Sequence, residues 1–435
     1  MRLALITTLE EFDEAVVKSL ETLGYHVIIV KVRGLSPEAL SEALRSLDFD
    51  YAIVPGSSPH DYEGLGFRVV KGPLSPYTLP YVLQLAGPDA LSPAVQAEKV
   101  LGPKVMADVA GRVYTDILSS LDPAFTVGSL KVPRNPPPIL VASDIYITES
   151  RAGDAAVEES SYRFSEGADI VVLSSHPNLD RKLYLNTLEA VMSTLRKPVA
   201  ADPARLETLV EAVDMGAPIA MSLTPGDLDK IPKTLRDRAA YVIIPGEASN
   251  WEVRVESLEK ARGRALELGY NSVILDPIVN PPVYRGTLES LIASRKLSKL
   301  GAPIMLGLNN AVEMADVDTH ASTATLILLA AEAGASIVMV GEESYKARGN
   351  TREAARAARI ASISLKLKTP PKDLGISILD FKGKNPPEGL KYLGRGRVRV
   401  EKPGLEVDCR DESSLEELKN RVFWGLIEEA CRPWI

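Results

Sequence analysis

Two aspartates stand directly after short apolar runs and directly before a proline: Asp202 in VAADP and Asp276 in VILDP. Such runs are typical of buried strands, so we expect each carboxylate at a strand end. A partly desolvated carboxylate needs hydrogen-bond donors, and the pair of N–H groups on one edge of an aminopyrimidinone ring would supply them. The alternative for Asp202 is a helix N-cap, because PARLETLVEAV follows it, whereas VNPPVYRG separates Asp276 from the next helix.

Two consecutive amides, Asn309 and Asn310, follow the apolar run in LGLNNAVE. Each can donate and accept hydrogen bonds, which suits a heterocycle with mixed ring nitrogens and carbonyls. The alternative is that one of them fixes its own loop through an Asx-turn.

The segment GEESYKARGNTREAAR places Lys346, Arg348 and Arg352 around Gly349, just before a predicted helix. Cations at a helix N-terminus favour an anionic group, so this segment is the candidate phosphate site. The alternative is an exposed, charged helix start. His176 has no second His or Cys in register, which makes a zinc site improbable, and no nucleophile triad is present.

Eight short apolar runs, each expected to be followed by a helical segment, position these residues. Eight β-then-α units in about 230 residues is the count of a TIM barrel, which carries its chemistry at the C-terminal ends of the strands. The runs are 139–144, 169–174, 198–202, 218–223, 240–245, 272–276, 303–308 and 336–340. Polar residues at their ends are Ser143, Asp144, Ser174, Ser175, His176, Asp202, Ser222, Thr224, Glu247, Asp276, Asn280, Asn309, Asn310, Glu342 and Glu343.

The segments before and after these units predict two further parts. Residues 1–125 alternate strands (2–7, 26–32, 50–54) with helices and read as a small doubly wound, Rossmann-like α/β domain. Its PGSSPHDYEG segment is a candidate ligand loop, or else a surface loop. The barrel then spans 132–370, and 371–435 forms a C-terminal α/β appendage that includes an amphipathic segment at 413–430.

The composition of the chain limits the classes of partner that we expect it to bind. With 45% apolar residues, 25% charged residues and a net charge of -8, the chain is globular and gives no electrostatic reason to bind nucleic acid or an anionic membrane. The opening MRLALITT is too short for a signal peptide, and Cys409 and Cys431 lack metal-ligand spacing, so we expect a cytoplasmic protein. Scarce Gln and 31 prolines hint at a thermophile.

With VAADP on the third strand and ILDP on the sixth, the chain resembles the pterin-binding TIM barrels, which include dihydropteroate synthases and methyltetrahydropterin-dependent methyltransferases. The stretches DPIVNPPVYRGTLESL, LGLNNAVEMADVDT and EESYKARGNTREAARAARI look most like the archaeal dihydropteroate synthase-like proteins. Their front end is also a small α/β domain, so the resemblance covers nearly the whole chain.

The resemblance implies that Asp276 holds the 2-amino and N3 edge of a pterin and that Asp202 lies near its other end. It implies a transferase that joins a dihydropterin-methyl diphosphate to an arylamine, as in folate or methanopterin biosynthesis, with Mg²⁺ and basic residues on the diphosphate. Pterin-binding candidates are therefore Asp202, Asp276, Ser222, Asn309 and Asn310, and phosphate-binding candidates are Lys346 and Arg348.

The chain departs from the synthase pattern at several of these positions. Asn309, Asn310 and Ala311 replace a Ser-Arg-Lys run after strand seven, IVMVGEE replaces an Arg and a His at strand eight, and Ser222 replaces an asparagine. LGLNN is instead similar to the methyltransferase branch, in which Asn310 would contact the methyl-bearing ring nitrogen.

Three functional interpretations follow from the sequence: the diphosphate-dependent transferase, a methyltetrahydropterin-dependent methyltransferase, and a non-catalytic pterin-binding protein. The expected partner is a small-molecule pterin, a homodimer is compatible with the sequence, and a corrinoid protein is a partner only for the methyltransferase.

Overall fold

The computed structural model describes residues 1–9, 13–247, 250–284, 286–376, 390–394, 397–400 and 405–408. The chain divides into two compact units: residues 1–120 with 360–377, and residues 121–359 with 378–435. The predicted boundaries at 125 and 370 stay predictions. The two cysteines and the amphipathic segment 413–430 lie outside the described residues.

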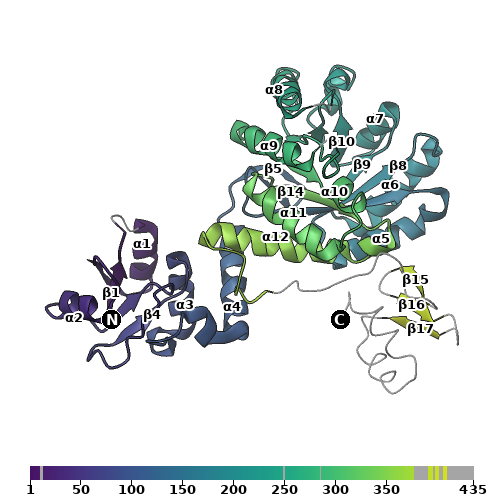
Figure 1. The fold of residues 1–435 in the computed structure, drawn as a ribbon. Coiled ribbons are helices and arrows are strands. Elements are labelled where there is room, and N and C mark those ends of the chain that lie inside the picture. The colour runs from purple at the N-terminus through teal and green to yellow at the C-terminus, as the bar shows by residue number, and fades with distance from the viewer. Residues whose placement is uncertain are drawn as a thin grey trace. The chain divides into compact units, whose positions relative to one another are not determined.

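Eight parallel strands form the second unit, as the sequence predicts. They are paired in chain order, β14 lies beside β7, and a bridge between Leu275 and Ile304 joins the remaining two edges, so the sheet closes into a barrel (Figure 1). The TIM-barrel prediction is therefore confirmed. The strands are β7 (Leu140–Ile147), β8 (Ile170–Ser175), β9 (Val199–Asp202), β10 (Ile219–Leu223), β11 (Ala240–Ile243), β12 (Val273–Leu275), β13 (Met305–Gly307) and β14 (Ile337–Gly341).

Helices follow seven of the eight strands. The expectation of a helical segment after every strand is wrong for β10, which is followed only by the 3₁₀ turns η4 (Pro225–Asp227) and η5 (Lys233–Leu235). The sequence PGDLDKIPK explains this, because its prolines and glycine break a helix. The helices are α5 (Asp154–Ser165), α6 (Arg181–Leu195), α7 (Leu206–Asp214), α8 (Trp251–Glu267), α9 (Thr287–Leu297), the short α10 (Asn309–Glu313), α11 (Thr319–Glu332) and α12 (Asn350–Leu367).

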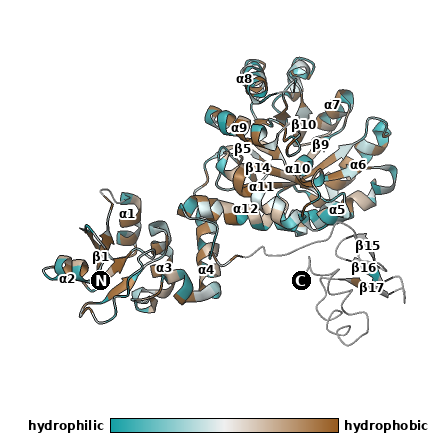
Figure 2. Ribbon diagram, in the orientation of Figure 1, coloured by the Kyte–Doolittle hydropathy of each residue, from teal (hydrophilic) through white to brown (hydrophobic). Residues whose placement is uncertain are grey.

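The barrel interior is an apolar core that is capped at its N-terminal end. Inward-facing residues of the strands pack with Val127 and Val132 of a hairpin formed by β5 (Pro123–Val127) and β6 (Leu130–Pro133). Figure 2 shows the apolar strands inside and hydrophilic outer faces on helices such as α8. The hairpin covers the N-terminal end, so the C-terminal ends of the strands form the accessible mouth of the barrel.

The first unit is a four-stranded parallel sheet with the order β2-β1-β3-β4, one strand more than the sequence predicted. In its 55–64 loop, Ser58 and Tyr62 are buried, and the Tyr62 hydroxyl donates to Leu35 O at 2.7 Å, so the loop is internally packed. A separate antiparallel sheet consists of β15 (Leu390–Gly394), β16 (Arg397–Val400) and β17 (Leu405–Asp408). The elements of the first unit are β1 (Arg2–Thr7), α1 (Glu14–Thr22), β2 (His26–Lys31), α2 (Pro37–Leu44), β3 (Tyr51–Val54), β4 (Val69–Lys71), α3 (Leu79–Ala86) and α4 (Ala97–Ser119).

Candidate functional site

Three carboxylates occupy the mouth of the barrel. Asp202 is the last residue of β9, Asp276 follows β12 directly, and Asp144 lies in β7 opposite Gly341 of β14. The charge of Asp202 raises the pKa of both other acids, so the three groups share one electrostatic environment. The two aspartates singled out in the sequence therefore lie on one rim, joined by Asp144.

Burial is the main cause of unusual pKa values in this group, because a desolvated carboxylate loses the hydration that favours its charge. It raises the pKa of Asp276 to about 7, that of Asp144 to about 7 and that of Asp202 to about 6. Nearby hydroxyls, Ser174 for Asp144 and Ser222 for Asp202, offset only part of this effect. Clusters of such groups are typical of functional sites.

Asp202 is held by a tyrosine below it and a strained serine beside it. The Tyr184 hydroxyl of α6 donates to Leu173 O at 2.7 Å and accepts from the Asp202 backbone N–H at 3.1 Å. Ser222 has a left-handed backbone with φ 62° at an irregularity in β10, and its side chain lies by Asp202. Strain at a non-glycine residue is characteristic of functional sites. The N-cap alternative for Asp202 is not realised, because α7 begins at Leu206.

Asp276 is positioned by a buried arginine that sequence reasoning missed. The Oδ1 atom of Asp276 accepts from the N–H of Ile278 at 2.7 Å. The arginine, Arg254 of α8, donates to the carbonyls of Pro277 and Ile278 at 3.2 and 2.9 Å. Arg254 is fully buried and its charge lowers the pKa of Asp276. The sequence feature that could have identified Arg254 is its position on the apolar face of α8, in line with Leu258. A cation on such a face is buried and must find a specific partner.

The two amides have different roles in the structure. Asn310 donates to Val279 O at 3.0 Å and so ties α10 to the segment that follows Asp276. Asn309 lies against Gly341, where a Cβ would come within 3.0 Å of its Nδ2, and its Oδ1 is buried without a hydrogen bond. Among the described residues, Asn309 Oδ1 and Asp144 Oδ1 are buried oxygens near the mouth that lack a hydrogen-bond partner.

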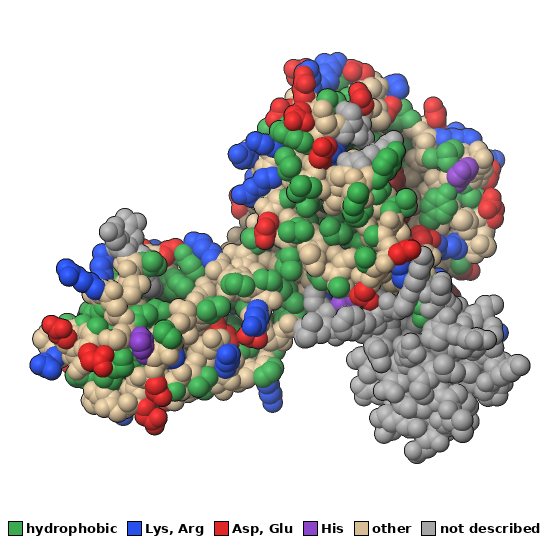
Figure 3. All heavy atoms as spheres, in the orientation of Figure 1, with side chains coloured by type: hydrophobic (Ala, Val, Ile, Leu, Met, Phe, Trp, Pro, Cys, Tyr) green, Lys and Arg blue, Asp and Glu red, His purple; other side chains and the backbone are tan. Residues whose placement is uncertain are grey.

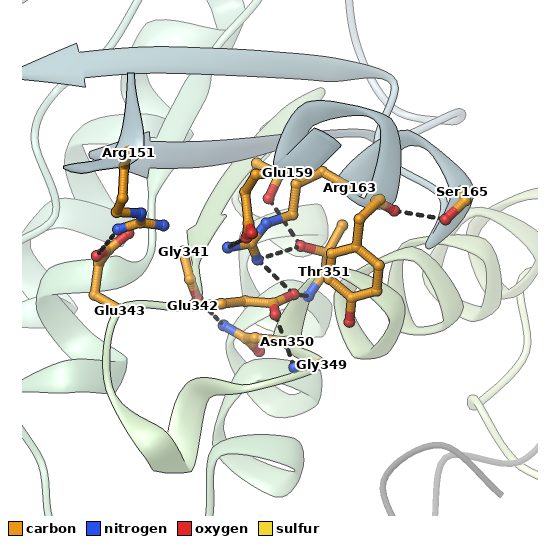
Figure 4. Close-up of polar contacts among 12 residues, drawn as sticks. Arg151, Glu159, Arg163, Ser165, Gly341, Glu342, Glu343, Gly349, Asn350 and Thr351 are labelled. Carbon is orange, nitrogen blue, oxygen red and sulfur yellow. Dashed lines mark hydrogen bonds and ion pairs between the residues drawn. The ribbon is translucent and has the colours of Figure 1, made fainter. Parts of the chain in front are cut away.

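In the corner after β14, the chain itself engages Lys346 and the first amides of α12. Lys346 is buried and donates to Val312 O at 2.8 Å and to Ala315 O, which speaks against its expected role as a phosphate ligand. Arg348 follows the 3₁₀ turn η7 (Tyr345–Ala347) and is partly buried. The buried carboxylate of Glu342 accepts the N–H groups of Gly349 and Thr351, both at 2.9 Å, at the start of α12 (Figure 4).

The structure also describes the residues considered for a metal site and the helices that could span a membrane. His176 is exposed, and its Nδ1 accepts from Asn178 N at 3.1 Å. Within the described ranges, no three His, Cys, Asp or Glu side chains gather closely enough to hold a metal ion. None of the described helices is long and apolar enough to cross a bilayer. Charges of both signs are interspersed on the face shown in Figure 3.

The mouth carboxylates give the stability of the protein a distinctive pH dependence. Their pKa values of about 6 to 7 lie above the ordinary aspartate value of 3.8, so their contribution to the free energy of unfolding is fully present below about pH 4 and is lost as the pH rises to about 7. We expect an Asp144→Asn/Asp276→Asn double variant to lose less stability than the wild type between pH 5 and about 7.5. Denaturant unfolding at both pH values checks this, and identical losses would contradict it.

The chain is similar to known proteins both in sequence and in structure. No family model matches the chain. An uncharacterized protein of Methanocaldococcus jannaschii is 23% identical over 432 residues, which cover 92% of this chain and 81% of the relative.

Several solved structures similar to the chain are dihydropteroate synthases, the family that the sequence motifs resemble. The enzyme of Thermus thermophilus in complex with 6HMPPP is 25% identical with a TM-score of 0.42, covering 51% of this chain and 92% of that structure. The enzyme of Xanthomonas albilineans in complex with 7,8-dihydropteroate is 19% identical with a TM-score of 0.42, covering 51% and 90%. The enzyme of Stenotrophomonas maltophilia is 18% identical with a TM-score of 0.43, covering 51% and 91%.

Proposed function

We propose that the barrel mouth binds a reduced pterin and that the protein transfers a group carried by this pterin. The observation that supports the proposal is the excess of hydrogen-bond acceptors at the mouth. Asp202 and Asp276 supply carboxylate oxygens, and buried acceptors of Asp144 and Asn309 lack partners among the described residues. Buried polar atoms are almost always hydrogen-bonded, so these atoms favour a ligand rich in donors.

A reduced pterin has the complementary pattern of groups. Its 2-amino group and N3–H form two parallel donors, which Asp276 would accept with both carboxylate oxygens in the manner of a bidentate pair. Asp202 would face N–H groups at the other end of the bicycle, with Ser222 beside it. Arg254 acts as a positioning residue, because it fixes the carbonyls of Pro277 and Ile278, the two residues that follow Asp276.

The two catalytic interpretations differ in the bond that breaks during the transfer. In the diphosphate-dependent reaction, the bond between the pterin methylene carbon and the diphosphate oxygen breaks, a carbon–nitrogen bond to the arylamine forms, and the amine proton goes to a base. In the methyl-pterin reaction, the bond between the methyl group and a ring nitrogen breaks, a bond from the methyl group to a nucleophilic acceptor such as a reduced corrinoid forms, and the ring nitrogen takes up a proton. The burial of Lys346 against two carbonyls favours the second reaction, because it withdraws a cation that a departing diphosphate would need.

Binding of a matched pair of heterocycles tests the proposal. We expect a tetrahydropterin to bind in anaerobic titration calorimetry, and the corresponding tetrahydrolumazine, in which a carbonyl replaces the 2-amino group, to bind at least about 100-fold more weakly. The reason is that the lumazine keeps the N3–H donor but turns a carbonyl towards the second oxygen of Asp276, which is then left without a donor. Equal affinity for both rings, or no affinity for either, would refute the assignment.

Two activity assays then separate the interpretations. Release of diphosphate on mixing a dihydropterin-methyl diphosphate with an arylamine marks the synthase-like reaction. Loss of the methyl group from a methyl-tetrahydropterin, in the presence of a corrinoid protein as acceptor, marks the methyltransferase. Binding without either reaction marks a non-catalytic pterin-binding protein.

A further inference from the structure

The N-terminus of α12 is the place where a barrel of this kind offers its amides to a phosphate. Here that place is filled by the protein itself. The Glu342 carboxylate accepts from Gly349 N and Thr351 N, both at 2.9 Å, and its side chain is only 1% exposed (Figure 4). The amides that would face an external anion are therefore already satisfied by an internal one.

Glu342 is held in this position as an anion. The guanidinium of Arg163, from α5, lies 2.6 Å from its Oε1 and is fully buried, and Glu159 lies 2.7 Å from the same guanidinium. Burial by itself would raise the pKa of Glu342, but Arg163 and the two amides outweigh it and keep the pKa below its usual value. The carboxylate thus takes the charge and the contacts that a phosphate oxygen would take.

Two further cations of this corner are also engaged by the chain. Arg151 lies 2.6 Å from the Glu343 carboxylate, and Lys346 donates to the carbonyls of Val312 and Ala315. On the same rim, Asp144 contributes another carboxylate whose Oδ1 has no hydrogen-bond partner within the described part of the chain. A phosphate placed at this corner would meet the carboxylates of Glu343 and Asp144, and the first amides of α12 are already occupied by Glu342.

We propose that the pterin accepted by this barrel carries no phosphate or diphosphate, and that Glu342 is the residue that determines this specificity by filling the anion position of α12. The inference rests on the proposed function, because it names the chemical class of the pterin that the same site takes. Like charges placed together cost enough to reject a ligand, so the Glu342 corner acts against phosphorylated pterins while the aspartates bind the ring.

The first experiment compares two pterins on the unaltered protein. We expect 6-hydroxymethyl-dihydropterin to bind at least about tenfold more tightly than its diphosphate at low ionic strength, because the added charges meet carboxylates. Equal or tighter binding of the diphosphate would overturn the inference and leave the proposed function intact. If neither compound binds, and the tetrahydropterin does not bind either, the proposed function itself fails and the inference with it.

The second experiment tests Glu342 directly, with inorganic phosphate as the probe. In Glu342→Ala, the amides of α12 lose their anion and Arg163 keeps only Glu159, so we expect phosphate to raise the melting temperature by a few degrees relative to chloride at equal ionic strength. The wild type and the control variant Glu343→Ala should show no such rise.

A phosphate effect of the same size in the wild type, or none in Glu342→Ala, would show that Glu342 does not occupy an anion site. If Glu342→Ala does not fold in chloride, its refolding in phosphate provides the same readout, and failure in both buffers counts against the exchange of one anion for another. The pterin comparison decides the ligand class in either case, because it uses the wild-type protein.

Discussion

Asp276→Asn is expected to weaken pterin binding by a factor of at least about 100 and to leave the fold intact. The carboxylate would accept two hydrogen bonds from the 2-amino and N3–H edge, and hydrogen bonds to charged groups contribute about 1.5–3 kcal/mol each. The asparagine keeps one acceptor but turns an amide N–H towards a ring N–H. Because burial already raises the pKa of Asp276 to about 7, removing its charge relieves a desolvation cost and should not lower the melting temperature at neutral pH.

Asp169→Asn is the matched control for this variant. Asp169 is also an acid with a pKa raised by burial, to about 6, but its Oδ2 accepts from Val141 N at 2.8 Å, near the start of β7. An asparagine preserves that acceptor, so titration calorimetry should show unchanged pterin affinity. If both variants lose affinity equally, or neither does, Asp276 is not the pterin ligand.

Arg163→Met is expected to lower the free energy of unfolding by about 3–5 kcal/mol, the usual cost of leaving one member of a buried ion pair without its partner. The methionine fills the space of the arginine stem, but Glu342 stays buried with only two amides to stabilise its charge. Denaturant unfolding followed by circular dichroism provides the measurement. Adding Glu342→Gln to this variant should recover part of the loss, because the uncompensated charge is then removed.

Arg151→Met supplies the comparison for the second variant. Arg151 forms an ion pair of the same length with Glu343, 2.6 Å, but the two side chains are 31% and 42% exposed. Water screens such a pair, so its loss should cost no more than about 1 kcal/mol. Equal destabilisation by the two substitutions would mean that burial does not govern the energetics of this corner.

The barrel and two of its mouth acids could be predicted because they depend on local patterns. Each strand is a short apolar run, and Asp202 and Asp276 follow such runs directly. Parallel strands bring their C-terminal ends to the same rim, so the pattern alone places both carboxylates together. Pro225 and Pro232 are the sequence features that favour 3₁₀ turns over a helix after β10. The eightfold repeat nevertheless led to the expectation of a helix there.

The remaining features depend on contacts between distant segments. Lys346 reads as a cation before a helix, and only the fold shows its ammonium bound to carbonyls 34 and 31 residues away. The ion pair between Arg163 and Glu342 joins α5 to the residue that follows β14. The sequence around either residue does not predict this pairing. The left-handed conformation of Ser222 is likewise imposed by the irregular pairing of β10.

The β5–β6 hairpin has a consequence for the order of events in any reaction at the mouth. Because this hairpin packs against the N-terminal end of the apolar core, the C-terminal mouth is the side from which ligands would reach the three aspartates. A pterin and its co-reactant would therefore approach from the same side, so a ring bound against the aspartates would have to be in place before the second reactant covers it.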